Sequence, residues 1–499
     1  MRGRIPIFYS ALMLTATNLL LRFVGTSFQV YLSTRVGAAG IGLLQLVMSV
    51  GGFAMVAGIA GIRTASMYLT AEELGKNKPE NVSRILSVCF LYSIFCSCAV
   101  GTSLYLLAPF IGTYWIGDDQ TIGAIRLFAA FLPTTCLCAV MTGYFTAANR
   151  IGTLAIVEVC EQFFSMTCTV TLLTFWGQDS PPKACQCIIL GSSAGSCLTL
   201  LLLILLRIRE KPTLSSRIPV QQRLYRAAIP LALGDIVKTG INTVENLIVP
   251  RQLSLNKSII SPLAAFGTVS GMVFPVLMFP ACILFGLAEL LIPELARCNA
   301  AGNRLRTSYL VQKSLRIALL YGSLFCGILF LIGQPLCLQI YGNTHAGVEL
   351  KRYALLIPML YCDTITDAMT KGLGQQKECV RYNIFTSAMD VIILYILLPK
   401  YGMSGYFFSF FITHLVNFFL SHRRLTAIAG KGLHFSDCAF TAAATITAVW
   451  FSSYVHSPIW RTCAYSCIWA AVLCLTNVIN RQDLLWLKGL VLRNKKHPA

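Results

Sequence analysis

Charged residues are scarce in this sequence, and acidic residues are the scarcest. Only 12% of the 499 residues are charged, with 20 Asp and Glu against 40 Lys and Arg, while 56% are hydrophobic. Soluble domains carry roughly a quarter of their residues as charges. The composition therefore excludes an ordinary soluble protein and predicts an all-α polytopic membrane protein.

Sequence motifs for metals and nucleotides are also missing. No cysteines are spaced as CxxC, and the six histidines are scattered, so we predict no zinc site. The sequence has no GxxxxGK[ST] loop, which argues against ATP hydrolysis within this chain. The 20 cysteines lie mostly inside apolar runs, where we interpret them as small buried hydrophobic residues. We expect no cofactor other than a coupling ion, Na⁺ or H⁺.

Apolar segments of membrane-spanning length recur along the whole chain. A transmembrane helix needs about 20 predominantly apolar residues. The sequence predicts fourteen such helices, at 5–32, 39–70, 84–110, 122–147, 152–176, 184–206, 227–250, 263–292, 314–334, 353–373, 381–398, 403–421, 437–455 and 460–479.

Lysine and arginine gather in alternate connections between these segments. If both termini are cytoplasmic, most of the 40 basic residues fall on the cytoplasmic side. This asymmetry is the positive-inside pattern, so we predict cytoplasmic termini. It also explains most of the net charge of +20, and a nucleic-acid partner is not needed.

Five short motifs recur at an interval of 224 or 225 residues, which indicates an internal repeat. The motif pairs are Ile5-Pro6 and Ile229-Pro230, Asn18 and Asn242, Gly61 and Gly286, Leu132-Pro133 and Ile357-Pro358, and Trp176-Gly177 and Tyr401-Gly402. Six helices separate equivalent positions, an even number, so the two copies have the same orientation in the membrane. We predict an N-lobe (1–206), a basic cytoplasmic linker (207–226), a C-lobe (227–424), two extra helices (425–480) and a basic cytoplasmic tail (481–499).

Polar residues form a stripe along the predicted helix at 227–250. Asp235, Lys238, Asn242, Glu245 and Gln252 recur at helical spacing on one face. Each ionisable residue at bilayer depth costs roughly 2.5 to 3.5 kcal/mol, so such a face needs a wet or protein-lined surface. We interpret it as the wall of a cavity. Alternatively, Asp235 and Lys238 neutralise each other as a packed pair.

The first predicted helix carries a similar stripe, which includes Asn18, Arg22 and Gln29. Polar faces on two repeat-related helices favour a transporter with two lobes around a central cavity. Nine residues are our candidates for binding a substrate in that cavity: Arg22, Asn18, Gln29, Arg63, Lys238, Asn242, Glu245, Glu158 and Glu161.

The beginning of the chain resembles a known family. The runs Asn18-x-x-x-Arg22-x-x-Gly25 and Leu32-Ser33-x-x-x-Gly37-Ala38-x-Gly40-x-Gly42-Leu43-x-Gln45 are similar to the opening of the stage V sporulation protein B family, within the MOP superfamily of flippases and exporters. Gly143-Tyr144-Phe145, Glu161-Gln162, Glu245 and Tyr341-Gly342 also match in order and spacing. Two positions depart from the family: Arg63 stands where proline is usual, and Ser165 where arginine is frequent.

This resemblance implies a fourteen-helix, MATE-like fold in a bacterial cytoplasmic (inner) membrane. It also implies a flippase that moves a polyprenyl-diphosphate-linked saccharide, such as lipid II, to the outer leaflet by alternating access. The expected partners are this anionic lipid and the bilayer, with the protein acting as a monomer and not as an enzyme.

An anionic diphosphate head needs cationic donors at depth. Arg22 is the first candidate donor, followed by Lys238 and Arg63; alternatively, Arg22 pairs with Glu245, or it and Arg63 reach towards the membrane surface. Glu158 and Glu161 could balance the arginines, carry a proton or bind sugar hydroxyl groups. Asp235, Asn383 and Asp390 offer oxygen ligands for a sodium ion, although polar side chains buried between helices have the same pattern.

Two other functions remain open from the sequence. A cation-coupled multidrug exporter of the same fold would use its acidic residues to bind an organic cation. A membrane-embedded transferase would use Asp363 and Asp367, which lie four residues apart on a helix, to hold Mg²⁺.

Overall fold

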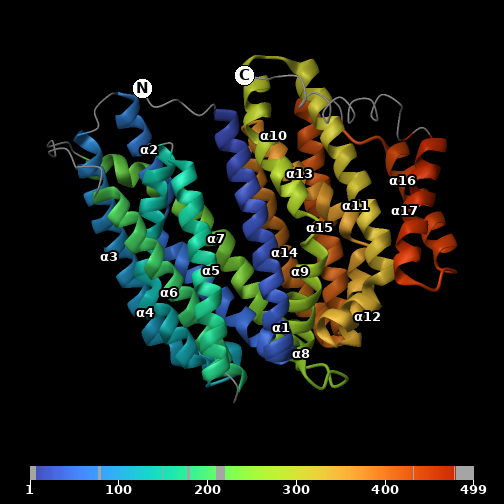
Figure 1. Ribbon diagram of the computed structural model, residues 1–499, viewed down its shortest axis with the longest axis horizontal. Helices are drawn as coiled ribbons and strands as arrows, with labels where there is room; N and C mark the ends of the chain where they lie inside the picture. The colour runs from blue at the N-terminus through green and yellow to red at the C-terminus, as the bar shows by residue number, and fades with distance from the viewer. Residues whose placement is uncertain are drawn as a thin grey trace. The chain divides into compact units, whose positions relative to one another are not determined.

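A computed structural model describes residues 7–76, 80–148, 150–176, 180–208, 220–430, 432–476 and 478 (Figure 1). The elements are α1 (Ile7–Ile59), α2 (Ile62–Gly75), α3 (Glu80–Phe110), η1 (Ile111–Ile116), α4 (Thr121–Ala147), α5 (Ile151–Phe175), α6 (Pro181–Ile208), α7 (Val220–Leu253), α8 (Pro262–Gly267), η2 (Thr268–Val273), α9 (Phe274–Met278), α10 (Cys282–Ala300), α11 (Arg304–Tyr341), α12 (Thr344–Ala354), α13 (Ile357–Gly372), α14 (Gln376–Tyr401), α15 (Met403–Ala429), α16 (Phe435–Ser452) and α17 (Pro458–Leu475). No strand occurs among these residues.

The all-α membrane architecture predicted from the sequence is confirmed, and each predicted segment overlaps one or more of these helices. Nine helices in the described part are long and apolar enough to cross a membrane, or ten when the bent pair α8–α9 and α10 is taken as one span. The count is below fourteen because the segment Leu19–Leu74 covers two of the predicted spans, and because α7, α13 and α16 do not meet the requirements of length and hydropathy.

The first two predicted spans are separated by a break in α1 at Gly37, where two helices meet at a kink. Gly37 has φ 75°, a left-handed conformation that glycine adopts without steric cost. A second break follows at Ala60 and Gly61, before α2 begins. A Cβ atom at Gly61 would collide with the carbonyl oxygen of Ala228 in α7, so glycine allows α7 to approach this break closely.

The chain divides into two compact units. Unit 1 comprises the described parts of residues 1–275 and 380–413, and unit 2 those of 276–379 and 414–499. In unit 1, buried residues such as Ile62, Ile85, Phe145, Leu203 and Leu224 join α2, α3, α4, α6 and α7 in one core. In unit 2, α16 and α17 pack on α11, where the Tyr465 hydroxyl donates to the carbonyl of Ser323 at 2.8 Å.

The predicted domain boundaries fall partly outside the described residues. α6 ends at Ile208 and α7 begins at Val220, so the last part of the predicted linker 207–226 is helical. Residues 209–219 and the predicted tail 481–499 lie outside the described part. The division into an N-lobe and a C-lobe remains a prediction.

Each unit contains a close helix crossing at a glycine. Gly143 of α4 faces α2, where a Cβ would lie 2.5 Å from the Arg63 carbonyl oxygen. Gly372 of α13 faces α10, where a Cβ would lie 2.9 Å from the carbonyl oxygen of Ile292. The break before α2 likewise has a counterpart in the 64° bend before α10. Both units thus have a small residue where two helices cross closely.

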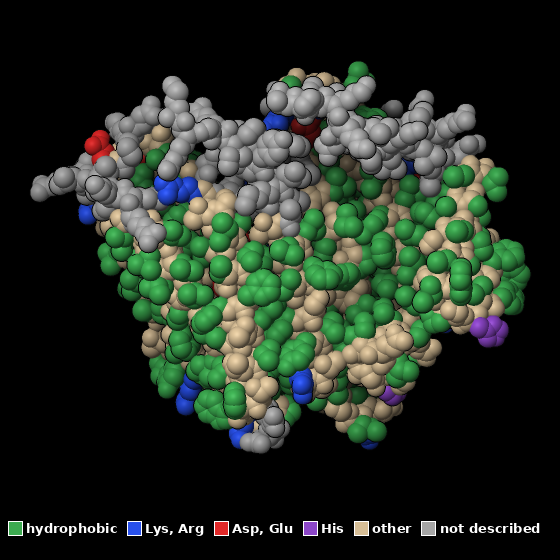
Figure 2. Space-filling model, in the orientation of Figure 1, with side chains coloured by type: hydrophobic (Ala, Val, Ile, Leu, Met, Phe, Trp, Pro, Cys, Tyr) green, Lys and Arg blue, Asp and Glu red, His purple; other side chains and the backbone are tan. Residues whose placement is uncertain are grey.

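Large apolar side chains cover the outside of the helices. Phe95, Phe175, Trp450 and Ile459 are among those that are mostly exposed. Hydrophobic side chains predominate on the face drawn in Figure 2, and few charged side chains interrupt its middle. An exposed apolar surface of this extent is stable against lipid and not against water.

Candidate functional site

A pair of carboxyl groups joins the polar stripe of α7 to the polar residues of α14 in unit 1. The carboxyl groups of Glu245 of α7 and Asp390 of α14 lie close enough to interact electrostatically. One turn earlier, the Ser387 hydroxyl of α14 donates to the Asn242 amide oxygen of α7 at 3.4 Å. The contacts step by three residues on both helices, so α7 and α14 run parallel with their polar faces together. The two stripes thus form one polar interface.

The α15 helix completes the surroundings of this acid pair. The hydroxyl groups of Ser409 and Thr413 donate to Oδ1 of Asp390 at 2.5 and 3.2 Å. The buried phenol of Tyr406 interacts electrostatically with both carboxyl groups. Sequence reasoning missed these three residues, although their spacing by three and four is that of a single helix face.

Two carboxylates that lie close together repel each other, and a proton or another cation bound between them relieves that repulsion. Asp235 is exposed and lies ten residues before Glu245, about 15 Å along the helix axis. The structure thus brings Asp390 to Glu245 and not to Asp235. Asn383 is half-buried on α14, seven residues before Asp390.

A second charged cluster lies on α2, α5 and α6. The exposed Arg63 side chain interacts electrostatically with the half-buried Glu158, and Glu161 lies one turn further along α5. The Thr199 hydroxyl of α6 donates to the Glu161 carboxylate at 2.7 Å. The structure therefore brings together three of the sequence-predicted residues, and adds Thr199, which the sequence analysis had missed.

The polar stripe of α1 lies against α5. A Cβ at Gly25 would lie 3.9 Å from the Gln162 side-chain nitrogen, so this face of α1 packs beside Gln162. Arg22, three residues earlier, has an exposed side chain. Gln29 is half-buried, and its side-chain nitrogen has no hydrogen-bond partner among the described residues. The Asn18 side chain lies outside the described part.

Lys238 is half-buried on α7, one turn before the exposed Asn242. The three basic candidate residues, Arg22, Arg63 and Lys238, thus lie on α1, α2 and α7 of unit 1. Among the described residues, no group of three or more His, Cys, Asp and Glu side chains is placed to hold a metal ion.

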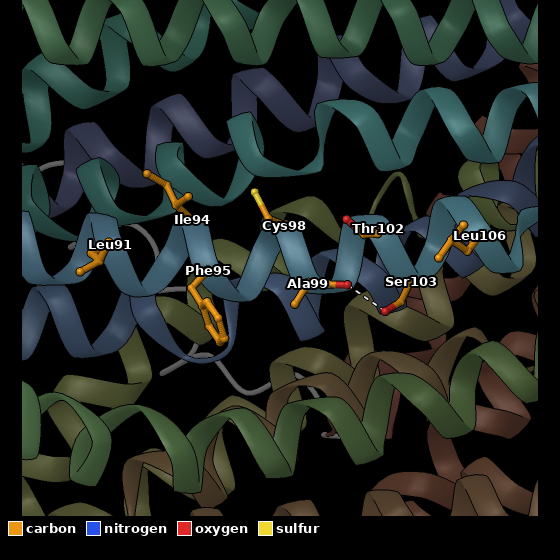
Figure 3. Close-up of a pocket in the computed structure, with 8 residues that line it drawn as sticks. All are labelled: Leu91, Ile94, Phe95, Cys98, Ala99, Thr102, Ser103 and Leu106. Atoms are coloured by element: carbon orange, nitrogen blue, oxygen red, sulfur yellow. Dashed lines mark hydrogen bonds between the residues drawn. The ribbon is translucent and has the colours of Figure 1, made fainter.

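A groove on α3 offers a different kind of surface (Figure 3). Leu91, Phe95 and Leu106 line it together with the small residues Cys98 and Ser103, all from one face of this helix. The Ser103 hydroxyl donates a hydrogen bond to the Ala99 carbonyl oxygen at 2.8 Å. The groove has no charged side chain among its lining residues.

These features define a multi-pass membrane protein with the fold of the MOP superfamily transporters. Residues 14–153 match the MatE family model. By structure, the chain is similar to the lipid II flippase MurJ in its inward closed conformation, with a TM-score of 0.67, 14% sequence identity, and coverage of 96% of this chain and 98% of that protein. It is also similar to the inward-facing conformation of a multidrug resistance MATE family transporter, with a TM-score of 0.65, 13% identity, and coverage of 84% and 99%.

By sequence, the chain is 21% identical to stage V sporulation protein B of Bacillus subtilis (strain 168) over 79% of this chain and 78% of that protein. Sporulation protein YkvU of the same organism is 20% identical over 73% of this chain and 82% of its own length. The resemblance and the MATE-like fold inferred from the sequence are thus confirmed.

Proposed function

We propose that the protein is a flippase that moves a polyprenyl-diphosphate-linked saccharide from the cytoplasmic to the outer leaflet. The observation that carries this proposal is the exposure of Arg22 and Arg63 on helices within the membrane-spanning segment Leu19–Leu74. An arginine exposed to hydrocarbon is costly, whereas one facing a hydrated, anionic substrate is not. A diphosphate also suits the planar guanidinium group, which can donate two hydrogen bonds at once.

The neighbouring residues have complementary roles in this proposal. Glu158 holds Arg63 through its charge while no substrate is bound, and the diphosphate takes its place when it enters. Lys238 and Asn242 of α7 contribute further donors, while Glu161, Gln29 and Asn18 bind sugar hydroxyl groups. We place these residues around one cavity between the proposed N-lobe and C-lobe.

The Glu245–Asp390 pair is proposed to bind the coupling ion. A proton shared by two carboxyl groups can be exchanged for a sodium ion or lost to one side of the membrane, and either event changes the charge between α7, α14 and α15. The wider sodium set of Asp235, Asn383 and Asp390 remains a prediction from the sequence.

A second candidate function is export of a cationic drug. It is favoured by the same carboxyl pair, because an organic cation can replace the shared proton, and by the fold shared with a multidrug resistance transporter. The structural relatives named above are a transporter and a flippase, and we propose that this chain, too, is not an enzyme. We also propose a bacterial inner-membrane location, cytoplasmic termini and a monomeric state.

The testing experiment measures transbilayer movement of a labelled polyprenyl-diphosphate sugar in proteoliposomes, under a membrane potential of either sign. Protein-dependent movement supports the flippase. Movement no faster than in empty liposomes, together with uptake of a cationic dye that stops in Glu245→Gln, would instead assign the protein to the drug exporters.

A further inference from the structure

An exposed arginine on the surface of unit 1 has no acidic partner among the described residues. Arg126 lies on α4, five residues or about 7.5 Å along the axis from the start of that helix at Thr121. Its guanidinium carbon lies 5.0 Å from the centroid of the Tyr105 ring on α3. A cation–π contact uses a face of the guanidinium group, so its N–H donors remain available. Arg126 is therefore able to bind an anion as well.

Aromatic side chains place Arg126 at the depth of the lipid headgroups. Phe110, Tyr114 and Trp115 follow Tyr105 at the end of α3 and in η1, and all four rings are exposed. The Phe110 ring packs on its neighbours, with centroids 5.3 Å from Tyr114 and 6.0 Å from Trp115. Exposed tryptophan and tyrosine side chains concentrate at the membrane–water interface, where each headgroup layer is about 5 to 8 Å thick. Arg126 thus lies near the boundary between headgroups and hydrocarbon.

The groove on α3 runs from this boundary towards the other side of the membrane (Figure 3). Its lining residues extend from Leu91 to Leu106, about 22 Å along the helix axis. Tyr105 follows Cys98 by seven residues, which places both on the same face of α3. One leaflet of the hydrocarbon core is about 15 Å deep, so the groove is long enough for an acyl chain whose headgroup lies beside Tyr105.

We propose that Arg126, Tyr105 and the α3 groove bind one anionic glycerophospholipid. The lipid phosphodiester accepts two hydrogen bonds from the Arg126 guanidinium and one from the Tyr105 hydroxyl, and one acyl chain lies along the groove. The charges favour this occupant over a polyprenyl diphosphate. A phosphodiester such as that of phosphatidylglycerol carries a single negative charge, which one guanidinium balances, whereas a diphosphate carries more.

This lipid is a ligand of the protein surface and not its cargo. Neither Arg126 nor Tyr105 belongs to the residues proposed to bind the transported saccharide, and the groove lies wholly on α3. The inference therefore does not rest on the proposed function. It assigns a use to an exposed charge on a membrane-spanning helix that would otherwise be costly in contact with hydrocarbon.

The test is a titration of the purified full chain in detergent with phosphatidylglycerol or with phosphatidylcholine of the same acyl chains, followed by native mass spectrometry. Wild type should bind phosphatidylglycerol about fivefold more tightly, the contribution of one arginine near anionic lipid. Arg126→Ala should lose this preference. Arg84→Ala is the control and should retain it, because Arg84 is also exposed on α3 but lies about 31 Å from Tyr105 along the axis.

Cys98→Phe tests the groove separately, since it fills the groove and leaves Arg126 in place. This variant should bind both lipids more weakly by a similar factor and keep the preference for phosphatidylglycerol. Equal affinity for phosphatidylglycerol in wild type and Arg126→Ala would overturn the site, and so would an equal loss in Arg84→Ala. Tighter binding of a polyprenyl diphosphate than of phosphatidylglycerol, lost in Arg126→Ala, would overturn the choice of a phospholipid. A protein that binds phosphatidylglycerol as expected but moves no lipid-linked saccharide would reject the flippase alone.

Discussion

Arg223 holds the beginning of α7 to α2 through the buried carboxylate of Glu73, with Nη1 donating at 2.9 Å. Its Nη2 donates to Glu72 at 2.6 Å, and Asn81 of α3 donates to the other oxygen of Glu73 at 2.6 Å. The ring of Tyr225 then packs on Tyr92 of α3, with centroids 5.9 Å apart. Because α7 carries Lys238, Asn242 and Glu245, these contacts fix one end of the helix that presents the proposed site.

Arg223→Ala should lower the stability of the protein by about 1.5 to 3 kcal/mol, since hydrogen bonds to charged groups contribute amounts of this order. Lys76→Ala is the matched control. Lys76 also pairs with Glu72, at 2.6 Å, but its side chain is 51% exposed, and exposed pairs contribute about 0 to 1 kcal/mol. Thermal unfolding in detergent compares the two variants. Equal midpoint temperatures would show that the contacts of Arg223 do not stabilise the packing of α7 on α2.

Gly143→Ala should destabilise unit 1 by about 1 to 3 kcal/mol, because the new Cβ forces α4 away from the backbone of α2. Gly52→Ala in α1 is the control, since a Cβ there meets nothing within 4 Å. That substitution should be neutral or stabilising by up to about 1 kcal/mol, because alanine has a higher helix propensity than glycine. If Gly143→Ala were as stable as Gly52→Ala, the close helix crossing in unit 1 would be incorrect.

Glu349 on α12, between membrane-spanning helices, gives a prediction on pH. Burial raises the pKa of its carboxyl, and the positive charges of Arg352 and His345 only partly offset that effect. A raised pKa in the folded state stabilises the fold below the ordinary pKa near 4.5, and this stabilisation is lost as the pH rises through the raised value.

Wild type should therefore be less stable than Glu349→Gln at neutral pH, and the difference should vanish on acidification. Unfolding midpoints of both proteins measured between pH 4 and 8 provide the check. A constant difference across this range would mean that Glu349 titrates as it does in the unfolded chain.

Glu245→Gln and Asp390→Asn should each remove the dependence of transport on the coupling ion, because a single carboxyl group cannot share a proton with an amide in the same way. Asn242→Ala, one turn away on α7, should retain that dependence while weakening substrate binding. The measurement is the initial rate of lipid movement in proteoliposomes with and without gradients of H⁺ and Na⁺. If transport by both acid variants still depended fully on the ion gradients, the proposal that this pair binds the coupling ion would be wrong.

The helices and their polar faces could be predicted from the sequence because helical periodicity is a local property. The polar stripe of α7 was recognised in this way, and it meets α14 at Asn242–Ser387 and Glu245–Asp390. Which helix supplies the remaining partners depends on tertiary packing. Ser409 and Thr413 of α15 were therefore not predicted as part of the site.

Distances along a helix set a second limit on sequence reasoning. Asp235 and Asp390 were grouped because both are acidic and lie in the same predicted lobe. The rise of α7 instead separates Asp235 by about 15 Å from the residue that contacts Asp390. The break between the first two predicted spans could be predicted, because a glycine in a polar interval indicates a connection, and α1 is interrupted at Gly37.

The most direct measurement of the central claim compares Arg22→Ala with Arg126→Ala in the proteoliposome assay with a labelled polyprenyl-diphosphate sugar. Both arginines are exposed on membrane-spanning helices, and Arg126 of α4, which lies over the ring of Tyr105 at 5.0 Å from its centroid, has no part in the proposed substrate site. Our account expects Arg22→Ala to slow protein-dependent movement at least about tenfold, the loss of one charged hydrogen-bonding contact. Arg126→Ala should remain close to wild type. Equal rates in Arg22→Ala and wild type would contradict the proposal that Arg22 binds the diphosphate.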